Sequence, residues 1–159
     1  MIKKDINQND ILNSELLNII DYNYIFDEKP IKRIKTKPTL ENSKSRLKSL
    51  ENKIKAIENC NLKKNASKIV FSDGNIQSPI MIVGEGPGQK EDELGKPFVG
   101  DAGNLLNKML KAINIKRDKV YITNVVNYRA PNNRKPEPSE INRYSEFLKE
   151  HISIIDPKI

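Results

Sequence analysis

The chain has 159 residues but a single cysteine, a single histidine and no tryptophan. The lone cysteine, Cys60, excludes an internal disulfide, and it excludes any metal or cluster site that needs four thiolates from this chain. No run approaches about 18 consecutive apolar residues, and the first residues lack the apolar core of a secretory signal. Because both of these features are lacking, we expect a cytoplasmic protein that does not associate with a membrane. The length suits one modest domain.

Positive charge is concentrated in one part of the sequence. The net charge is +7, and residues 29–64 hold twelve Lys or Arg against three Glu, so the rest of the chain is slightly acidic. A basic segment of this kind favours a polyanion such as nucleic acid, through release of counterions. A solvated, lysine-biased linker explains the same composition equally well, and both interpretations stay open.

Residues 1–40 are expected to form a mobile N-terminal extension and a basic linker, which Pro30 and Pro38 bracket. From residue 40 onward, apolar side chains recur three or four positions apart. This spacing predicts an amphipathic helix over 40–57 that docks onto a core. We therefore place the folded domain at residues 41–159.

The remaining sequence alternates between β-rich and helical segments. The order is two strands joined by a short loop, a glycine-rich loop, a helix, a third strand, a proline-rich loop and a last helix, which predicts an α/β fold. The second strand is apolar throughout, as is typical of a parallel sheet covered on both faces. Two parallel strands and two helices cannot cover both faces and both edges of such a sheet. We therefore expect later strands to be missing. The strands are expected at 69–71, 80–83 and 120–126, and the helices at 102–113 and 139–152.

The glycine-rich loop after residue 83 is the most informative stretch. The G-x-G-x-x-G pattern fails because Gln89 or Glu91 takes its last position, and no Gly-Lys-Ser/Thr is present. The acidic residues of the loop would repel nucleotide phosphates unless a metal intervened. What remains is a tight loop at the carboxyl end of a parallel strand, where open α/β sheets bind their ligands.

Two blocks of this sequence are specific enough to compare with known families. The first is GEGPGQKEDELGKPFVGDAGNLL at 84–106, and the second is YITNVVNYRAPNNRKPEPSEI at 121–141. Both resemble the motifs of the family 4 uracil-DNA glycosylases, which are iron–sulfur proteins. The resemblance implies the N-terminal part of a three-layer α/β/α fold with a parallel sheet. It also implies the activity of the family, hydrolysis of the N-glycosidic bond that releases uracil from DNA in base excision repair. Uracil-containing DNA, single- or double-stranded, is then the expected partner.

The matching positions receive the roles of the family one by one. Phe98 is expected to stack on a uracil flipped out of DNA, with core packing as the alternative. Asn124 is expected to read the uracil edge through its amide, with a strand cap as the alternative. The implied catalytic residues are Glu85, Glu91 and Asn124, and the implied substrate-binding residues are Gly86, Pro87, Gly88, Phe98, Asn124 and Asn133.

Two of these assignments have plainer alternatives. Glu91 is expected to position water or gate the pocket, but a solvated loop acid fits its sequence context nearly as well. Asn133 and the residue after it equally suit a structural turn. The expected DNA-binding residues are Lys32, Arg33, Lys35, Lys37 and Arg134.

The sequence departs from the family at its metal centre. Members bind a four-iron, four-sulfur cluster through four cysteines, and the matching positions here read Ile57, Cys60, Tyr128 and Tyr144. Only Cys60 remains, and one thiolate cannot hold a cluster that takes four. We therefore expect no cofactor and no metal, with the tyrosines filling the volume by packing.

A second departure concerns the end of the sequence. The resemblance implies further strands and a His-Pro loop whose histidine stabilises the uracil oxygen, and the sequence ends before them. The single histidine, His151, does not match that position, and we expect it on the surface of the last helix. The activity is then expected to be impaired, or to need a separately encoded C-terminal half. A non-catalytic DNA-binding remnant and the product of a disrupted gene are the alternatives.

Overall fold

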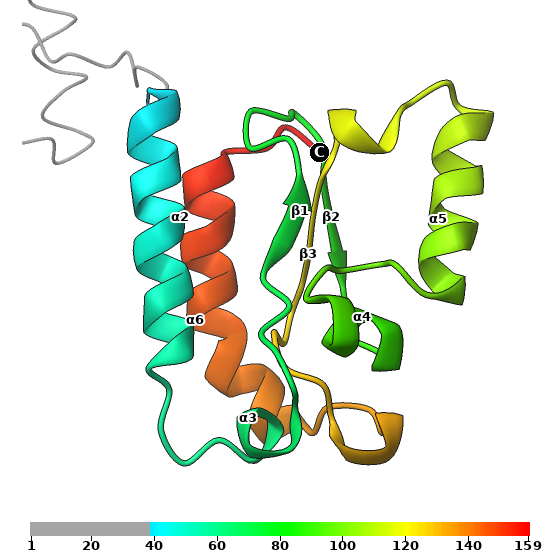
Figure 1. Cartoon of the computed structure of the whole chain (residues 1–159). Helices are drawn as coiled ribbons and strands as arrows, with labels where there is room; N and C mark the ends of the chain where they lie inside the picture. Colours follow the sequence, from blue (N-terminus) through cyan, green and yellow to red (C-terminus); the bar gives the residue numbers. More distant parts are fainter. Residues whose placement is uncertain (1–38) are drawn as a thin grey trace, which may run out of the picture. The chain divides into compact units, whose positions relative to one another are not determined.

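The computed structural model of the chain describes residues 39–159 (Figure 1). The expected extension and linker therefore lie outside the described residues apart from their last two positions, and so do the predicted DNA-binding residues Lys32, Arg33, Lys35 and Lys37. The described part is an α/β fold, as predicted. Its elements are α2 (Leu40–Lys55), α3 (Asn61–Asn65), β1 (Ser72–Gly74), β2 (Met81–Gly84), α4 (Gln89–Leu94), α5 (Asp101–Ala112), η1 (Arg117–Lys119), β3 (Tyr121–Asn124), η2 (Pro131–Asn133) and α6 (Pro138–Ile155).

The sheet is mixed rather than wholly parallel. Its order is β1-β3-β2, so the central β3 runs parallel to β2 and antiparallel to β1. The parallel pair agrees with the expectation, whereas β1 begins at Ser72 and not at residue 69. The two early strands also do not pair with each other, because residues 75–80 carry the chain past the end of β3, which lies between them.

Helices lie on both sides of this sheet. Figure 1 shows α2 and α6 side by side and antiparallel on one side, with α5 on the other. The predicted amphipathic helix is confirmed by α2, since Leu47, Leu50 and Ile54 are buried. An ion pair between Lys53 and Glu150, 2.8 Å long, joins α2 to α6. None of the described helices is long and apolar enough to cross a membrane.

The helix α5 leaves much of its apolar stripe uncovered. Leu110 is buried and Leu106 is half-buried against the sheet. Leu105, Met109 and Ile113, which follow one another at helical spacing, are 59%, 61% and 63% exposed. A row of large apolar side chains of this kind is typical of a surface that another polypeptide covers.

The prediction that His151 lies on the surface is wrong. Its side chain is 2% exposed and stacks on Phe71, with ring centroids 4.8 Å apart. Its Nε2 lies 2.6 Å from the hydroxyl oxygen of Tyr121. His151 follows Tyr144 by two helical turns, so it shares the buried face of α6. Burial lowers the pKa of His151 to about 4.

This buried histidine makes the stability of the fold dependent on pH. The imidazole stays neutral in the folded state down to about pH 4, whereas an unfolded histidine takes up a proton below about pH 6.5. The unfolded chain therefore binds more protons between these pH values. The contribution of His151 to the free energy of unfolding is fully present above about pH 6.5 and is lost as the pH falls toward 4. We expect a loss of up to about 3 kcal/mol. Denaturant unfolding of the wild type and of His151→Gln at a series of pH values measures it.

The control is built into that comparison, because the carboxylates titrate alike in both proteins. The variant should show a shallower fall of stability over this pH range, since glutamine can accept a hydrogen bond but does not titrate there. Equal slopes for the two proteins would contradict a neutral buried His151.

Candidate functional site

The candidate site begins where β2 and β3 end. Gly84 and Asn124, the last residues of the two strands, are partners in the parallel register. The loops that follow stay joined, because the Val125 N–H donates to the Gly84 carbonyl at 2.8 Å and the Val126 N–H to that of Glu85 at 3.2 Å. Both loops therefore leave the sheet at one edge, which is where open α/β sheets bind ligands.

A pocket of about 400 Å³ lies at this edge. The start of α5 contributes Gly100, Asp101 and Ala102 to its lining. These three were not among the predicted site residues, and their only signal was their place inside the first sequence block. The structure brings together six of the predicted site residues in this lining: Glu85, Gly86, Gly88, Glu91, Phe98 and Asn124.

Asn124 carries a polar group that the fold does not explain. Its side chain is 3% exposed, and among the described residues its Nδ2 has no hydrogen-bond partner. A buried donor left unpaired costs about 1–3 kcal/mol. Asn127 shows the ordinary solution, because its amide donates to the Val70 carbonyl at 3.1 Å. The strand cap considered for Asn124 would pair this amide in the same way, and it is not formed.

Gly84 allows the Asn124 amide and the Phe98 ring to approach each other. A Cβ on Gly84 would lie 2.4 Å from Asn124 Oδ1 and 2.6 Å from the nearest carbon of the Phe98 ring, closer than side chains tolerate. The half-buried Phe98 packs against the buried cluster around Leu110 and also lines the pocket. Core packing, the alternative for Phe98, is therefore real, and it leaves the ring at the pocket wall.

The two glutamates of the pocket have different environments. Glu91 Oε1 accepts the backbone N–H of Val99 at 2.9 Å and that of Gly100 at 2.7 Å. Its carboxylate thus ties α4 to the start of α5, which is not the situation of a solvated loop acid. Glu85 is exposed at the pocket.

The remaining predicted residues line a second cleft, of about 180 Å³, which shares the first loop with the pocket. Pro87, Asn133 and Arg134 belong to it. Asn133 Oδ1 accepts a hydrogen bond from Arg129 Nε at 2.7 Å. The Arg134 guanidinium donates to both carboxylate oxygens of Glu140 at 2.8 Å, and this holds the pKa of Glu140 below its usual value. Both side chains therefore support the proline-rich loop.

The described residues thus form an α/β fold with a pocket at the ends of its parallel strands. The family model described as Uracil DNA glycosylase superfamily matches residues 71–159, which is more than half of the chain. The chain belongs to this superfamily, and the predicted resemblance is confirmed.

Several relatives carry the name Type-4 uracil-DNA glycosylase. The one from Thermotoga maritima is 45% identical over 107 residues, which is 67% of this chain and 56% of the relative. The one from Sulfurisphaera tokodaii is 45% identical over 114 residues, or 71% and 52%. The one from Archaeoglobus fulgidus is 42% identical over 106 residues, or 67% and 53%. The chain thus spans about half the length of the curated relatives it matches.

The four positions matched to cluster ligands lie together in the structure. Cys60, Tyr128 and Tyr144 are buried in one cluster, and Ile57 packs against it. Tyr144 Oη lies 3.5 Å from Cys60 Sγ. Burial raises the pKa of both tyrosines, which keeps their phenols neutral.

These side chains do not fit a four-iron, four-sulfur cluster. One thiol, two neutral phenols and an alkyl group replace the four thiolates that such a cluster takes. The part of the chain that the structure describes also holds no group of three or more His, Cys, Asp or Glu side chains that could bind a metal ion.

Proposed function

We propose that this chain is the uracil-recognising half of a uracil-DNA glycosylase, and that it needs a second polypeptide to release the base efficiently. The observation that carries the proposal is the Asn124 amide, buried and unpaired in a pocket that Phe98 also lines. An unpaired buried donor is expensive for the fold, so its presence favours a ligand that supplies the acceptor.

Uracil offers the groups that the Asn124 amide lacks. One of its carbonyl oxygens accepts from Nδ2, and the neighbouring ring N–H donates to Oδ1. Cytosine presents an amino group and an unprotonated ring nitrogen there, so the same amide rejects it. The Phe98 ring supplies a face for the pyrimidine, and Gly86 and Gly88 give a wall without side chains.

The reaction we propose is hydrolysis of the N-glycosidic bond in DNA repair. The oxygen of a water molecule bonds to C1′ of the sugar as the bond between C1′ and uracil N1 breaks. The electron pair leaves with uracil, and the resulting anion takes up the proton that the water releases. Glu85 is the exposed acid placed to hold that water, and Asn124 stabilises the charge on the departing base. Glu91 acts by holding the loop at Val99 and Gly100.

The partner we propose is a separately encoded C-terminal half. The strand β2 lies at the edge of the sheet, and Val83 on it is exposed. The uncovered stripe of α5, formed by Leu105, Met109 and Ile113, adds an apolar surface. An unpaired sheet edge and an apolar helix face both favour cover by another polypeptide. The relatives have about twice the length of the matched region, so their second half is a partner of the right size.

Base recognition can be tested without that partner. We expect free uracil to bind the wild-type chain more tightly than cytosine does, in ligand-observed NMR titrations. Asn124→Ala should weaken uracil binding about tenfold or more, since hydrogen bonds worth about 1–3 kcal/mol are lost. Asn142→Ala, which removes an exposed asparagine of α6, is the matched control and should leave binding unchanged.

Other outcomes separate the rival functions. Equal binding of the two bases, unaffected by Asn124→Ala, would overturn the proposal. A DNA-binding remnant without chemistry would instead bind DNA in a strongly salt-dependent manner, with no preference for uracil. The product of a disrupted gene would show neither kind of binding.

The purified chain should carry no iron, even when it is prepared without oxygen. We expect this because Ile57, Tyr128 and Tyr144 stand at three of the four ligand positions and pack as core. Metal analysis and the visible absorption spectrum provide the measurement. About four iron atoms per chain with a broad absorption in the visible range would show that the cluster forms through other ligands.

A further inference from the structure

Arg117 does not line the pocket, yet all five N–H donors of its guanidinium are used. Nε and Nη2 donate to Asp73 Oδ2 at 3.1 and 3.0 Å. The second hydrogen of Nη2 goes to the Pro97 carbonyl at 2.7 Å, and Nη1 donates to the Phe98 carbonyl at 3.0 Å and to Asn107 Oδ1 at 3.2 Å. A guanidinium has no further donors, so the arrangement is complete.

The backbone that Arg117 holds has an unfavourable conformation. The backbone of Phe98 has φ +53°, in the left-handed region that residues other than glycine rarely adopt. Its carbonyl is also pressed against α5, because a Cβ on Gly103 would lie 1.9 Å from that oxygen. A strained residue persists only where its surroundings fix it, and such residues gather at functional sites.

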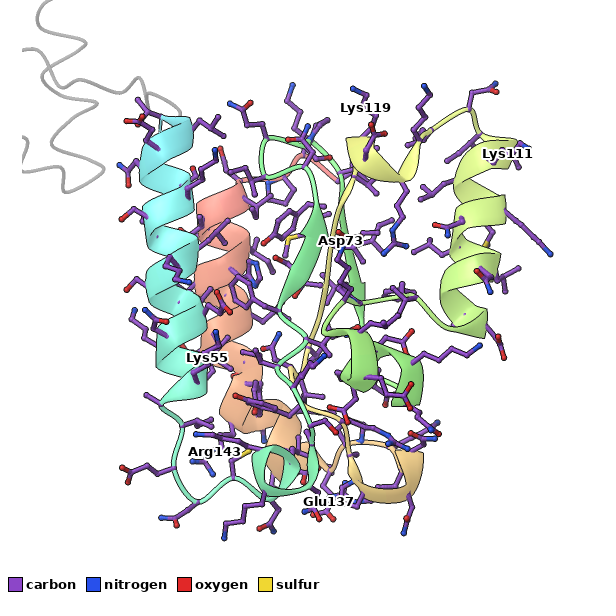
Figure 2. All side chains as sticks on the ribbon, viewed as in Figure 1. Lys55, Asp73, Lys111, Lys119, Glu137 and Arg143 are labelled. Carbon is purple, nitrogen blue, oxygen red and sulfur yellow. The ribbon has the colours of Figure 1, made fainter. Side chains whose placement is uncertain are left out.

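We propose that Arg117 is a positioning residue for Phe98. By holding two successive carbonyls, those of Pro97 and Phe98, it fixes the peptide planes on either side of the Phe98 Cα and with them the direction of the Phe98 side chain. Asp73 on β1, labelled in Figure 2, anchors the guanidinium to the sheet. The ring is thereby held at the pocket wall before any base arrives. The proposal rests on the proposed function only for the use of the ring as a stacking face.

Lysine cannot replace arginine in this role. Its ammonium group has three donors on a flexible stem, whereas the planar guanidinium reaches four acceptor oxygens at once. Arg117→Lys keeps the positive charge beside Asp73 and so separates the geometry from the charge.

A second arginine provides the matched control. The guanidinium of Arg143, labelled in Figure 2, also donates to two successive carbonyls, those of Asn59 at 2.8 Å and Glu58. It lies on α6, and none of these three residues lines the pocket. Arg143→Lys therefore makes the same chemical change at a carbonyl pair unrelated to Phe98.

The first measurement needs no ligand. With 4-fluorophenylalanine placed at position 98 alone, the ¹⁹F NMR signal reports the surroundings of that ring. In the protein that keeps Arg117, we expect a single signal shifted from that of free 4-fluorophenylalanine. In Arg117→Lys, we expect the signal to broaden and to move toward that of the free amino acid. Arg143→Lys should leave it unchanged. In Arg117→Ala, guanidinium chloride well below its denaturing range should restore the signal, and sodium chloride at the same ionic strength should not.

The second measurement uses free uracil. We expect Arg117→Lys to weaken its binding about tenfold, and Arg143→Lys to have no effect. An unchanged fluorine signal in Arg117→Lys would overturn the positioning role, whatever the base does. A fluorine signal that changes as expected, in a wild-type protein that binds no uracil, would uphold the positioning role and overturn the proposed function instead. If Arg117→Lys fails to fold, the milder Asp73→Asn weakens the anchor of the Arg117 guanidinium instead. An unchanged fluorine signal in Asp73→Asn also counts against the positioning role of Arg117.

Discussion

Mixing the chain with the C-terminal half of a Type-4 relative is expected to raise uracil release from single-stranded DNA by about 100- to 1000-fold over the chain alone. The two residues proposed to recognise the base, Asn124 and Phe98, line one pocket of the chain. The Asn124 amide alone is not expected to stabilise the departing anion sufficiently, and one further stabilising donor is worth about this factor. The Thermotoga maritima relative, which is 45% identical in the matched region, supplies a suitable half.

The predicted gain is tested by single-turnover uracil release. The rate is measured for the chain, for the pair and for the pair with Asn124→Ala. The substitution should remove most of the gain, because the pocket of the pair then lacks the Asn124 amide that is proposed to bind the uracil edge. Asn142→Ala in the same pair should retain the gain. Release by the lone chain that its own Asn124→Ala abolishes would show that no second half is needed. Halves that bind each other but stay inactive would favour the product of a disrupted gene.

The pocket was predictable because its parts follow one another in the sequence. Gly84 ends one parallel strand and Asn124 ends the next, and parallel neighbours bring their carboxyl ends to one edge. The loop between residues 84 and 106 then brings Phe98 back to the neighbourhood of these two residues through its own short helix and turn. Local order along the chain was therefore enough to predict that these residues meet at one pocket.

The features that the sequence concealed depend on contacts between distant segments. Arg117 stands in a lysine-rich stretch before β3, and its role depends on Asp73, 44 residues away. His151 has the polarity of a surface residue, and only the Tyr121 hydroxyl and the Phe71 ring give it a place in the interior. No pattern within one helix or one loop contains this information.

The proline-rich loop shows a third kind of difficulty. The resemblance placed Arg134 near the DNA backbone, with a structural turn as an equal alternative, and in the structure its guanidinium donates to both carboxylate oxygens of Glu140. Asn133 likewise receives its hydrogen bond from Arg129. Residue type predicted that these side chains would be polar contacts, and only the folded loop shows that their contacts include other residues of the same loop.

Replacing Tyr144 by alanine is expected to cost about 3–5 kcal/mol of unfolding free energy, the largest single loss of stability that we predict. The side chain is fully buried, and its ring packs edge-on against Phe147 with centroids 6.0 Å apart. It stands where the family places a cluster ligand, so in this chain the core around Cys60 is held by packing. A loss of this size is a large share of the total stability of a domain, about 5–15 kcal/mol.

Tyr144→Phe is the control for this prediction, because it keeps the ring and removes only the hydroxyl that lies 3.5 Å from Cys60 Sγ. We expect it to cost no more than about 1 kcal/mol, the usual net contribution of one hydrogen bond. Urea unfolding of the wild type and the two variants, with and without an iron chelator, gives the comparison. Similar stabilities for Tyr144→Ala and Tyr144→Phe would contradict the packing role, and a wild type that the chelator destabilises would show that a metal holds this core.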